Sequence, residues 1–277
     1  MSPDDYCQQK TVASGSSFYY SFLFLPPPRR QAITALYAFC REVDDVVDES
    51  LDPAMARAKL AWWRTEIGAL YSGQPSHPVT QALAISLKQF SLPQEQLHEI
   101  IDGMEMDLDQ SRYADFRELH LYCYRVASVV GLLAAEIFGY SDRRTLKYAH
   151  DLGLAFQLTN IIRDVGEDAR RRRIYLPQDE LERFGVTETD LLQARYTENF
   201  RQLMEFQIQR AQSMYEQAFA QLPVTDRKSQ RAGLIMAAIY RTTLNEIVRD
   251  GCRVLDRRIS LTPLRKIWLA GKTWISA

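Results

Sequence analysis

The stretch that indicates the fold is RRQAITALYAFCREVDDVVDE, residues 29–49, which follows three consecutive prolines at positions 26–28. Its apolar side chains recur every three or four residues, which is the spacing of one buried face of an α-helix. They are Ile33, Leu36, Tyr37, Cys40, Val43 and Val47. Proline suits a helix start, because the first turn needs no partner for its backbone N–H groups. The sequence therefore predicts a long amphipathic helix over 29–49.

Similar periodicity covers much of the remaining chain. Further helices are predicted over 54–72, 79–90, 94–111, 116–138, 142–170, 197–221 and 226–250. Turn signals separate them, such as Ser72-Gly73 and Gly139, which is typical of a helix C-cap. The sequence contains no useful run with strand alternation, no repeat and no low-complexity linker. We therefore predict one all-α domain that covers residues 1–277.

Bulk composition narrows the class of protein. The 277 residues are 46% hydrophobic and 25% charged, as expected for a globular chain with a large core. The net charge of −1 argues against nucleic-acid binding as the main function. The four cysteines and four histidines lack the spacing of zinc, redox or carboxylate di-iron motifs.

Two observations bear on the location of the protein in the cell. The N-terminal sequence MSPDDYCQQK is polar and acidic, unlike a secretory signal. The longest apolar runs, Val129–Ala135 and Ala232–Tyr240, fall short of the ~20 residues that a membrane span needs. We expect a cytoplasmic protein, of unspecified oligomeric state, with at most weak peripheral contact with the inner face of a membrane. The segment Leu264–Ile275, with its tryptophans and basic residues, could be an interfacial helix or a packed terminal helix.

The predicted helix over 29–49 carries a row of polar residues near its C-terminal end. Tyr37, Arg41, Asp44 and Asp48 are three or four residues apart and share one face, with Asp45 beside them. Valines surround the aspartates, so this face is not a plainly solvated one.

A second polar row lies in FQLTNIIRDVGED, residues 156–168. Gln157, Asn160, Asp164 and Asp168 step by three, four and four along an otherwise apolar helix. Burying such a row without partners would cost several kcal/mol, and a metal ion would remove that cost. Carboxylate and amide oxygens favour Mg²⁺ over zinc or copper.

Each acidic row taken singly could be ordinary surface charge. Two rows on apolar helices favour a site instead, and Arg41, Arg163 and the run 170–173 could bind phosphate. That run could also be an exposed helix end. Asp102 and Asp107 could lie near the same site or on the surface. Together these features predict a site for a diphosphate and magnesium.

Four segments resemble, in order and spacing, the squalene/phytoene synthase family. They are SSFYYSFLFLPPPRR (16–30), ALYAFCREVDDVVDE (35–49), YCYRVASVVG (122–131) and FQLTNIIRDVGEDARRRRIYLP (156–177). The N-terminal third is most similar to bacterial presqualene diphosphate synthases of the hopanoid pathway. The resemblance implies an all-α isoprenoid-synthase bundle around a central apolar cavity.

The resemblance also implies roles for individual residues. The implied ligands of two or three Mg²⁺ ions are Asp44, Asp48, Asn160, Asp164 and Asp168. The implied substrate-binding residues are Ser17, Phe18, Tyr37, Arg41, Asp45, Gln157, Arg163 and Tyr240. The implied catalytic residues are Tyr37, Arg41, Tyr122 and Arg163. The family's early S-x-S-F motif is altered here, because Gly15 replaces its first serine, and Ser14 or Ser16 could take over that hydroxyl's role.

The implied reaction is a prenyltransferase reaction, the head-to-head condensation of two farnesyl diphosphates to presqualene diphosphate and pyrophosphate, which would feed squalene and hopanoid synthesis. Alternatives are phytoene synthase, which uses two geranylgeranyl diphosphates, a full squalene synthase, and a non-catalytic helical scaffold. No GxGxxG fingerprint is present, and no nicotinamide cofactor is expected. Aromatic residues that could line a dry tunnel, or simply fill the core, are Phe18, Tyr19, Tyr20, Phe22, Phe24 and Phe39.

Overall fold

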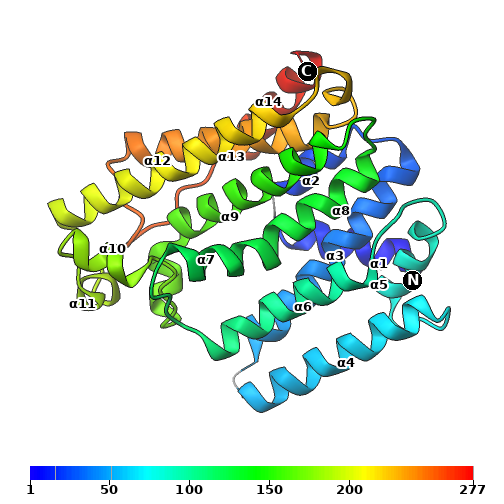
Figure 1. Cartoon of the computed structure of the whole chain (residues 1–277), viewed down its shortest axis with the longest axis horizontal. Coiled ribbons are helices and arrows are strands. Elements are labelled where there is room, and N and C mark those ends of the chain that lie inside the picture. Colours follow the sequence, from blue (N-terminus) through cyan, green and yellow to red (C-terminus); the bar gives the residue numbers. More distant parts are fainter. Residues whose placement is uncertain (16, 51, 277) are drawn as a thin grey trace.

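The computed structural model describes residues 1–15, 17–50 and 52–276, and they form a helical bundle (Figure 1). The helices are α1 (Pro3–Ala13), α2 (Phe18–Phe22), α3 (Pro27–Glu49), α4 (Pro53–Tyr71), α5 (Pro78–Ser86), α6 (Gln94–Asp109), α7 (Phe116–Cys123), η1 (Tyr124–Ser128), α8 (Val129–Phe138), α9 (Arg144–Arg170), α10 (Gln178–Arg183), α11 (Glu188–Leu192), α12 (Glu198–Gln221), η2 (Val224–Asp226), α13 (Arg231–Arg249) and α14 (Pro263–Ser276). In these described ranges β-pairing is limited to one isolated bridge between Arg112 and Ile174. The predicted all-α class is confirmed.

The predicted long helices agree closely with the observed ones. α3 begins at Pro27, inside the proline run, and ends at Glu49 as predicted. The predicted helix over 116–138 is continuous but contains a π-helical turn, η1, at Tyr124–Ser128. The predicted helix over 226–250 begins only at Arg231, because Val224–Asp226 forms a separate 3₁₀ turn.

Several short helices were not predicted. α1 lacks a clear apolar stripe, and its start is stabilised by a capping box in which Ser2 and Asp5 exchange hydrogen bonds. α2, α10 and α11 span only five or six residues, too short to show helical periodicity.

The long helices α12, α9, α7–α8, α6 and α4 run roughly parallel across the molecule (Figure 1). One hydrophobic cluster surrounds α9, α12 and α13, and a second joins α3, α4, α5 and α6. Phe18 and Val126 pack against both clusters. The assignment of the whole chain to a single domain stays a prediction.

Two glycines let α8 and α9 approach closely beside the π-helical turn. A Cβ atom at Gly153 would lie 2.4 Å from the carbonyl oxygen of Ala127, and one at Gly131 would lie 2.3 Å from that of Ala149. Neither backbone could tolerate a side chain without moving. The glycines therefore fix the position of η1 against α9.

In the part of the chain that the structure describes, one helix, Phe116–Phe138, is long and apolar enough by length and composition to cross a membrane. This corrects the expectation that every apolar run is too short, because α7, η1 and α8 join into a single rod. Its Leu119, Val129 and Leu133 are buried in the bundle, as in the core helix of a globular protein.

Candidate functional site

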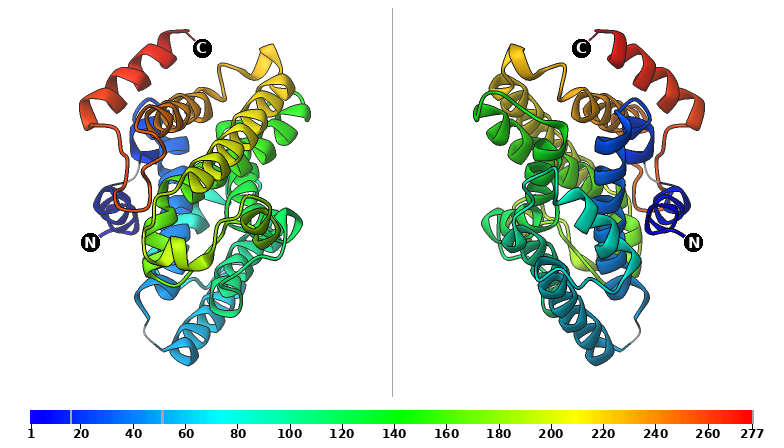
Figure 2. Two further views of the ribbon diagram at one scale, coloured as in Figure 1. Left: turned by 90° about the vertical axis from the view of Figure 1, so that its left-hand side faces the viewer. Right: turned by 90° about the vertical axis from the view of Figure 1, so that its right-hand side faces the viewer.

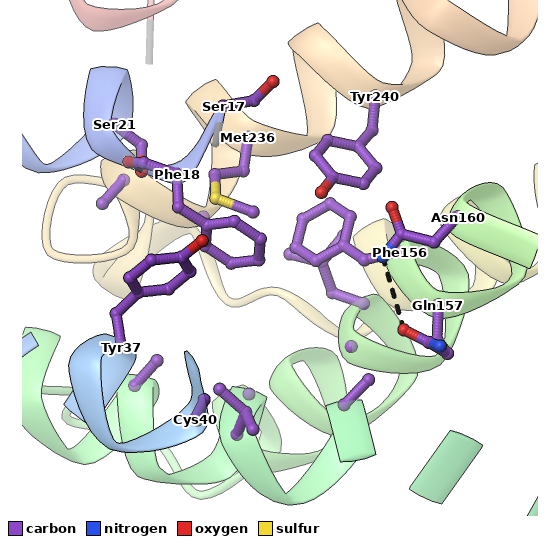
Figure 3. Close-up of a pocket in the computed structure, with 18 of the residues that line it drawn as sticks. Ser17, Phe18, Ser21, Tyr37, Cys40, Phe156, Gln157, Asn160, Met236 and Tyr240 are labelled. Atoms are coloured by element: carbon purple, nitrogen blue, oxygen red, sulfur yellow. Dashed lines mark hydrogen bonds between the residues drawn. The ribbon is translucent and has the colours of Figure 1, made fainter. Parts of the chain in front are cut away.

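One cavity of about 610 Å³ lies between α2, α3, η1, α8, α9 and α13. Its predicted site residues are Ser17, Phe18, Tyr37, Arg41, Asp44, Tyr122, Gln157, Asn160, Arg163 and Tyr240. Figure 3 shows the rings of Phe18, Tyr37 and Tyr240 gathered around this space, with Gln157 and Asn160 on the adjacent helix. The structure thus brings residues from five separate segments to one place.

The first acidic row, on α3, is paired with basic side chains. Arg41 forms ion pairs with both Asp44 and Asp45. Lys10 of α1 lies 2.9 Å from Asp45, whose side chain does not line the cavity. The predicted role of Asp45 in substrate binding stays a prediction, although its carboxylate mainly joins α3 to α1.

In the second row, on α9, the first two residues, Gln157 and Asn160, line the cavity. The Nδ2 atom of Asn160 donates to Oε1 of Gln157 at 3.3 Å (Figure 3). The Oδ1 atom of Asn160 is buried and has no hydrogen-bond partner in the described chain. Asp164 accepts from Nε of Arg163 at 2.8 Å and from Nε of Arg258 at 2.9 Å.

The two rows are linked across the bundle by the arginines that follow α9. Arg171 and Arg173 donate to the two carboxylate oxygens of Asp48 at 2.7 and 2.8 Å. These arginines lie three and five residues after Asp168, so the end of α9 faces the end of α3. The arginine run is therefore partly a structural partner of the first row rather than only an exposed helix end.

The pKa values of the aspartates differ because their partners differ. Burial, together with the charges of Asp48 and Asp107, raises the pKa of Asp44 to about 7 despite Arg41. Burial and the nearby charges of Asp164 and Asp107 raise the pKa of Asp168 to about 8. Burial would also raise the pKa of Asp48, but the hydrogen bonds from Arg173 and Arg171 outweigh it and lower that pKa. Burial is the largest cause of both raised pKa values, so Asp44 and Asp168 are the aspartates of the site whose charged form is most disfavoured.

A further carboxylate, that of Asp107 on α6, belongs to the site. Its two oxygens accept from the hydroxyls of Tyr175 at 2.8 Å and Tyr122 at 3.1 Å. Burial raises the pKa of Asp107 to about 6, although Arg173 and both tyrosines oppose the shift. Asp102, in contrast, pairs with Arg64 away from the cavity. The sequence could not separate these two positions, because both lie on the same helix without a motif.

The structure partly explains the altered S-x-S-F motif, in which Gly15 replaces the first serine. The hydroxyl of Tyr37 donates to Oγ of Ser14 at 3.1 Å, and Ser14, Gly15 and Ser17 all line the cavity. Ser14 therefore places a hydroxyl beside the predicted substrate-binding tyrosine. Ser16, the other candidate, lies outside the described residues.

Aromatic rings line the middle of the cavity. Phe18 lies 5.3 Å from Tyr37 and 6.2 Å from Tyr240 between ring centroids, and Phe156 lies 4.9 Å from Tyr240. Phe22 also lines the cavity, as predicted. The remaining tunnel candidates do not: Phe39 is buried against Trp63, Phe24 stacks on Trp274, and Tyr19 and Tyr20 contact one another. Phe39 is therefore a core residue, as the alternative stated, whereas Tyr19, Tyr20 and Phe24 are half-buried outside the cavity.

The predicted metal ligands fit a metal site that a bound ligand would complete. Among the described residues, no group of three or more histidine, cysteine or acidic side chains is already arranged around a metal position. The unpartnered Oδ1 of Asn160 and the carboxyl groups of Asp44 and Asp168 nevertheless provide oxygen donors of the kind that Mg²⁺ binds. Arginines now hold three aspartates of the predicted set, Asp44, Asp48 and Asp164.

An all-helical bundle with an apolar cavity and acidic rows at its polar end is the architecture of the isoprenoid synthases. The family description "Squalene/phytoene synthase" matches residues 11–265. The chain belongs to the squalene/phytoene synthase family, and its activity is of the prenyltransferase type that joins prenyl diphosphates head to head.

Individual relatives refine the comparison. Phytoene synthase of Arthrospira platensis is 38% identical over 94% of this chain and 89% of its own length. The 15-cis-phytoene synthase of Synechocystis sp. is 35% identical over 98% of this chain and 84% of its own. A crystal structure of a dehydrosqualene synthase superposes with a TM-score of 0.85 at 29% identity, covering 99% of this chain and 96% of the other.

Two parts of the site were missed by sequence reasoning. Residues 258–261 and Lys266 lie after the last recognisable motif but fold back to line the cavity. Tyr175, which hydrogen-bonds Asp107, stood inside the quoted RRRRIYLP segment without being singled out. Its position next to the arginine run was the only available signal.

Proposed function

We propose that this protein is a Mg²⁺-dependent phytoene synthase that joins two geranylgeranyl diphosphate molecules head to head. The observation that carries the proposal is the similarity to phytoene synthases of 38% and 35% identity over nearly the whole chain. The condensation of two farnesyl diphosphates, which the sequence analysis predicts, is kept as the second candidate.

The shape of the cavity supports a substrate with a charged head and an apolar tail. Arg41, Asp44, Asn160 and Arg163 supply charged and polar groups to its lining. Much of the remaining wall is apolar and comes from α2, α3, α8, α9 and α13. It includes Phe22, Ile33, Val130, Phe138, Leu152 and Met236. A diphosphate at the polar end would leave its prenyl chain among these side chains, away from water.

The proposed metal ligands are Asp44, Asp48, Asn160, Asp164 and Asp168. When bound there, Mg²⁺ would supply Lewis-acid neutralisation of a diphosphate leaving group. Arg171, Arg173 and Arg258 now neutralise Asp48 and Asp164. These arginines would be free to contact diphosphate oxygens once the aspartates bind cations.

The chain's own side chains would orient the reacting groups. Arg163 is buried and held charged by Asp164, and Tyr240 lies beside it, so both can bind a diphosphate oxygen. The faces of Phe18, Phe156 and Tyr240 could stabilise a passing allylic cation by about 0.5–2 kcal/mol each. Tyr122, which donates to Asp107, would lie near the leaving group.

The overall reaction balances without a reductant. Each of the two prenyl diphosphates loses its pyrophosphate, a carbon–carbon bond forms between the two first carbons, and two protons leave the coupled chain. Squalene would instead require a hydride donor. The reaction therefore agrees with the expectation that no nicotinamide is needed.

The second candidate is the condensation of two farnesyl diphosphates to presqualene diphosphate. The similarity to a dehydrosqualene synthase structure over 99% of the chain favours keeping it. In both candidates the same polar residues would bind the diphosphates, and only the length of the prenyl tails differs.

The deciding experiment supplies the purified protein with geranylgeranyl diphosphate, with farnesyl diphosphate and with both, each with and without NADPH. Mass spectrometry should detect a C40 hydrocarbon and pyrophosphate from the longer substrate with Mg²⁺ alone, and EDTA should abolish the reaction. A C30 product formed in clear preference would support the second candidate. No condensation of either substrate would contradict both.

A further inference from the structure

The C-terminal helix α14 exposes a row of large apolar side chains. Leu264, Ile267, Trp268 and Ile275 are 80%, 51%, 60% and 85% exposed. Their spacing of three, four and seven or eight residues places them on one face of the helix. Figure 2 shows α14 on the outside of the bundle, which agrees with the exposure of these four side chains.

A neighbouring face of α14 is already packed, so the exposed row cannot simply turn inward. Ala270 is buried, and Trp274 stacks on Phe24 of α2 with ring centroids 5.2 Å apart. The guanidinium group of Arg231 of α13 also lies over the Trp274 ring, 4.8 Å from its centroid. The helix is thus anchored on one side and apolar on the other.

Positive charges accompany the exposed row. α14 contains Arg265, Lys266 and Lys272 and no acidic residue. Arg265 and Lys272 are seven residues apart, so they lie along the same edge of the row, and Lys272 lies over the Trp268 ring at 5.1 Å. An apolar face with tryptophan and a basic edge matches the boundary between lipid headgroups and acyl chains.

The row also lies next to the cavity. Arg258, Ile259, Ser260 and Leu261, which precede α14, line the cavity together with Lys266 of α14 itself. One edge of the cavity and the exposed row therefore belong to consecutive parts of the same segment.

We propose that the outer face of α14 binds the surface of an anionic lipid bilayer. The apolar row enters the headgroup–acyl boundary. Lys272 contacts anionic headgroups, and Arg265 exchanges its ion pair with Glu246 for a headgroup. The cavity edge at residues 258–261 and Lys266 then faces the bilayer, which would let an apolar chain enter or leave without crossing water. This last consequence rests on the proposed function, whereas the binding of α14 to lipid does not.

The test is flotation of the full chain with vesicles of phosphatidylcholine, with and without phosphatidylglycerol. The double variant Ile267→Ser, Trp268→Ser removes two of the exposed side chains, neither of which lines the cavity. The matched control is Ile85→Ser, Trp62→Ser, because Ile85 and Trp62 are similarly exposed, at 52% and 45%, on α5 and α4.

The wild-type protein and the control should float with anionic vesicles, and added salt should weaken the binding. The α14 variant should bind at least about tenfold more weakly while its activity on detergent-dispersed substrate is unchanged. No flotation of the wild type, or equal flotation of the α14 variant, would overturn the proposal. So would sedimentation showing a dimer that this variant dissociates, because the face would then bind a second copy. Flotation without any prenyl condensation would refute the proposed function alone.

Discussion

At the level of single residues, Asp164 shows how arginines hold the carboxylate of a proposed metal ligand. Two arginines, Arg163 and Arg258, share its carboxylate, and it stands between Asn160 and Asp168 on α9. The carboxylate is therefore held by side chains that a metal and a diphosphate could replace.

We expect Asp164→Asn to lower kcat at least about a hundredfold, because the change removes one negative oxygen from the proposed metal ligands. Pyrophosphate release measures the effect, and circular dichroism checks the fold. Asp109→Asn, an exposed partner of Arg57, is the matched control and should stay near wild type. Equal activity of the two variants would favour the scaffold alternative.

A second prediction concerns Asp107, which accepts hydrogen bonds from Tyr122 and Tyr175. With its pKa raised to about 6, the carboxyl group loses its proton near and above that pH, and only then accepts from both hydroxyls. Activity should therefore fall below about pH 6, and Asp107→Asn should lower kcat and remove that acidic limb.

The pH–rate profile of Asp107→Asn measures this role, with Asp102→Asn as the control. Asp102 contacts Arg64 rather than a site residue, so its variant should keep the wild-type profile. An unchanged acidic limb in the Asp107 variant would assign the limb to another group.

At the level of elements, sequence periodicity located the long helices well. α3, α4, α6, α9 and α12 begin and end within a few residues of their predicted bounds. Their apolar stripes repeat over many turns, whereas α10 and α11 are too short for such a signal. The π-helical turn η1 could not be read from periodicity, because its backbone register depends on packing against Gly153.

The packing of η1 on α9 gives a testable contrast between two glycines. Gly153→Ala should destabilise the protein by about 1–3 kcal/mol, because its Cβ would lie 2.4 Å from the carbonyl oxygen of Ala127. Gly68→Ala in α4 meets no atom within 4 Å and should stabilise by about 0.5–1 kcal/mol. Urea unfolding measures both. Similar effects of the two changes would contradict the close approach.

At the level of the whole molecule, the raised aspartate pKa values link stability to pH. Between about pH 4 and pH 7–8 the native state retains protons on Asp44 and Asp168 that the unfolded chain has released. Their contribution to stability is therefore greatest in acid and is lost as the pH rises through the native pKa values.

Mg²⁺ with pyrophosphate should reverse this loss, since cations bind the deprotonated carboxylates and leave the unfolded chain unaffected. We expect a larger rise in Tm at about pH 8 than at about pH 6 in thermal unfolding. Asp168→Asn should reduce the difference between the two pH values. A ligand-induced shift that is independent of pH would argue against ion binding at these aspartates.

The sequence by itself determined the helical class, the long helices and the chemistry of the two polar rows, because these depend on spacing within single helices. Only the tertiary structure decided that Arg173 pairs with Asp48, that Asp107 rather than Asp102 belongs to the site, and that Arg258 returns to Asp164. Such neighbours come from helices far apart in the chain. Their proximity depends on how the helices pack, which local periodicity does not encode.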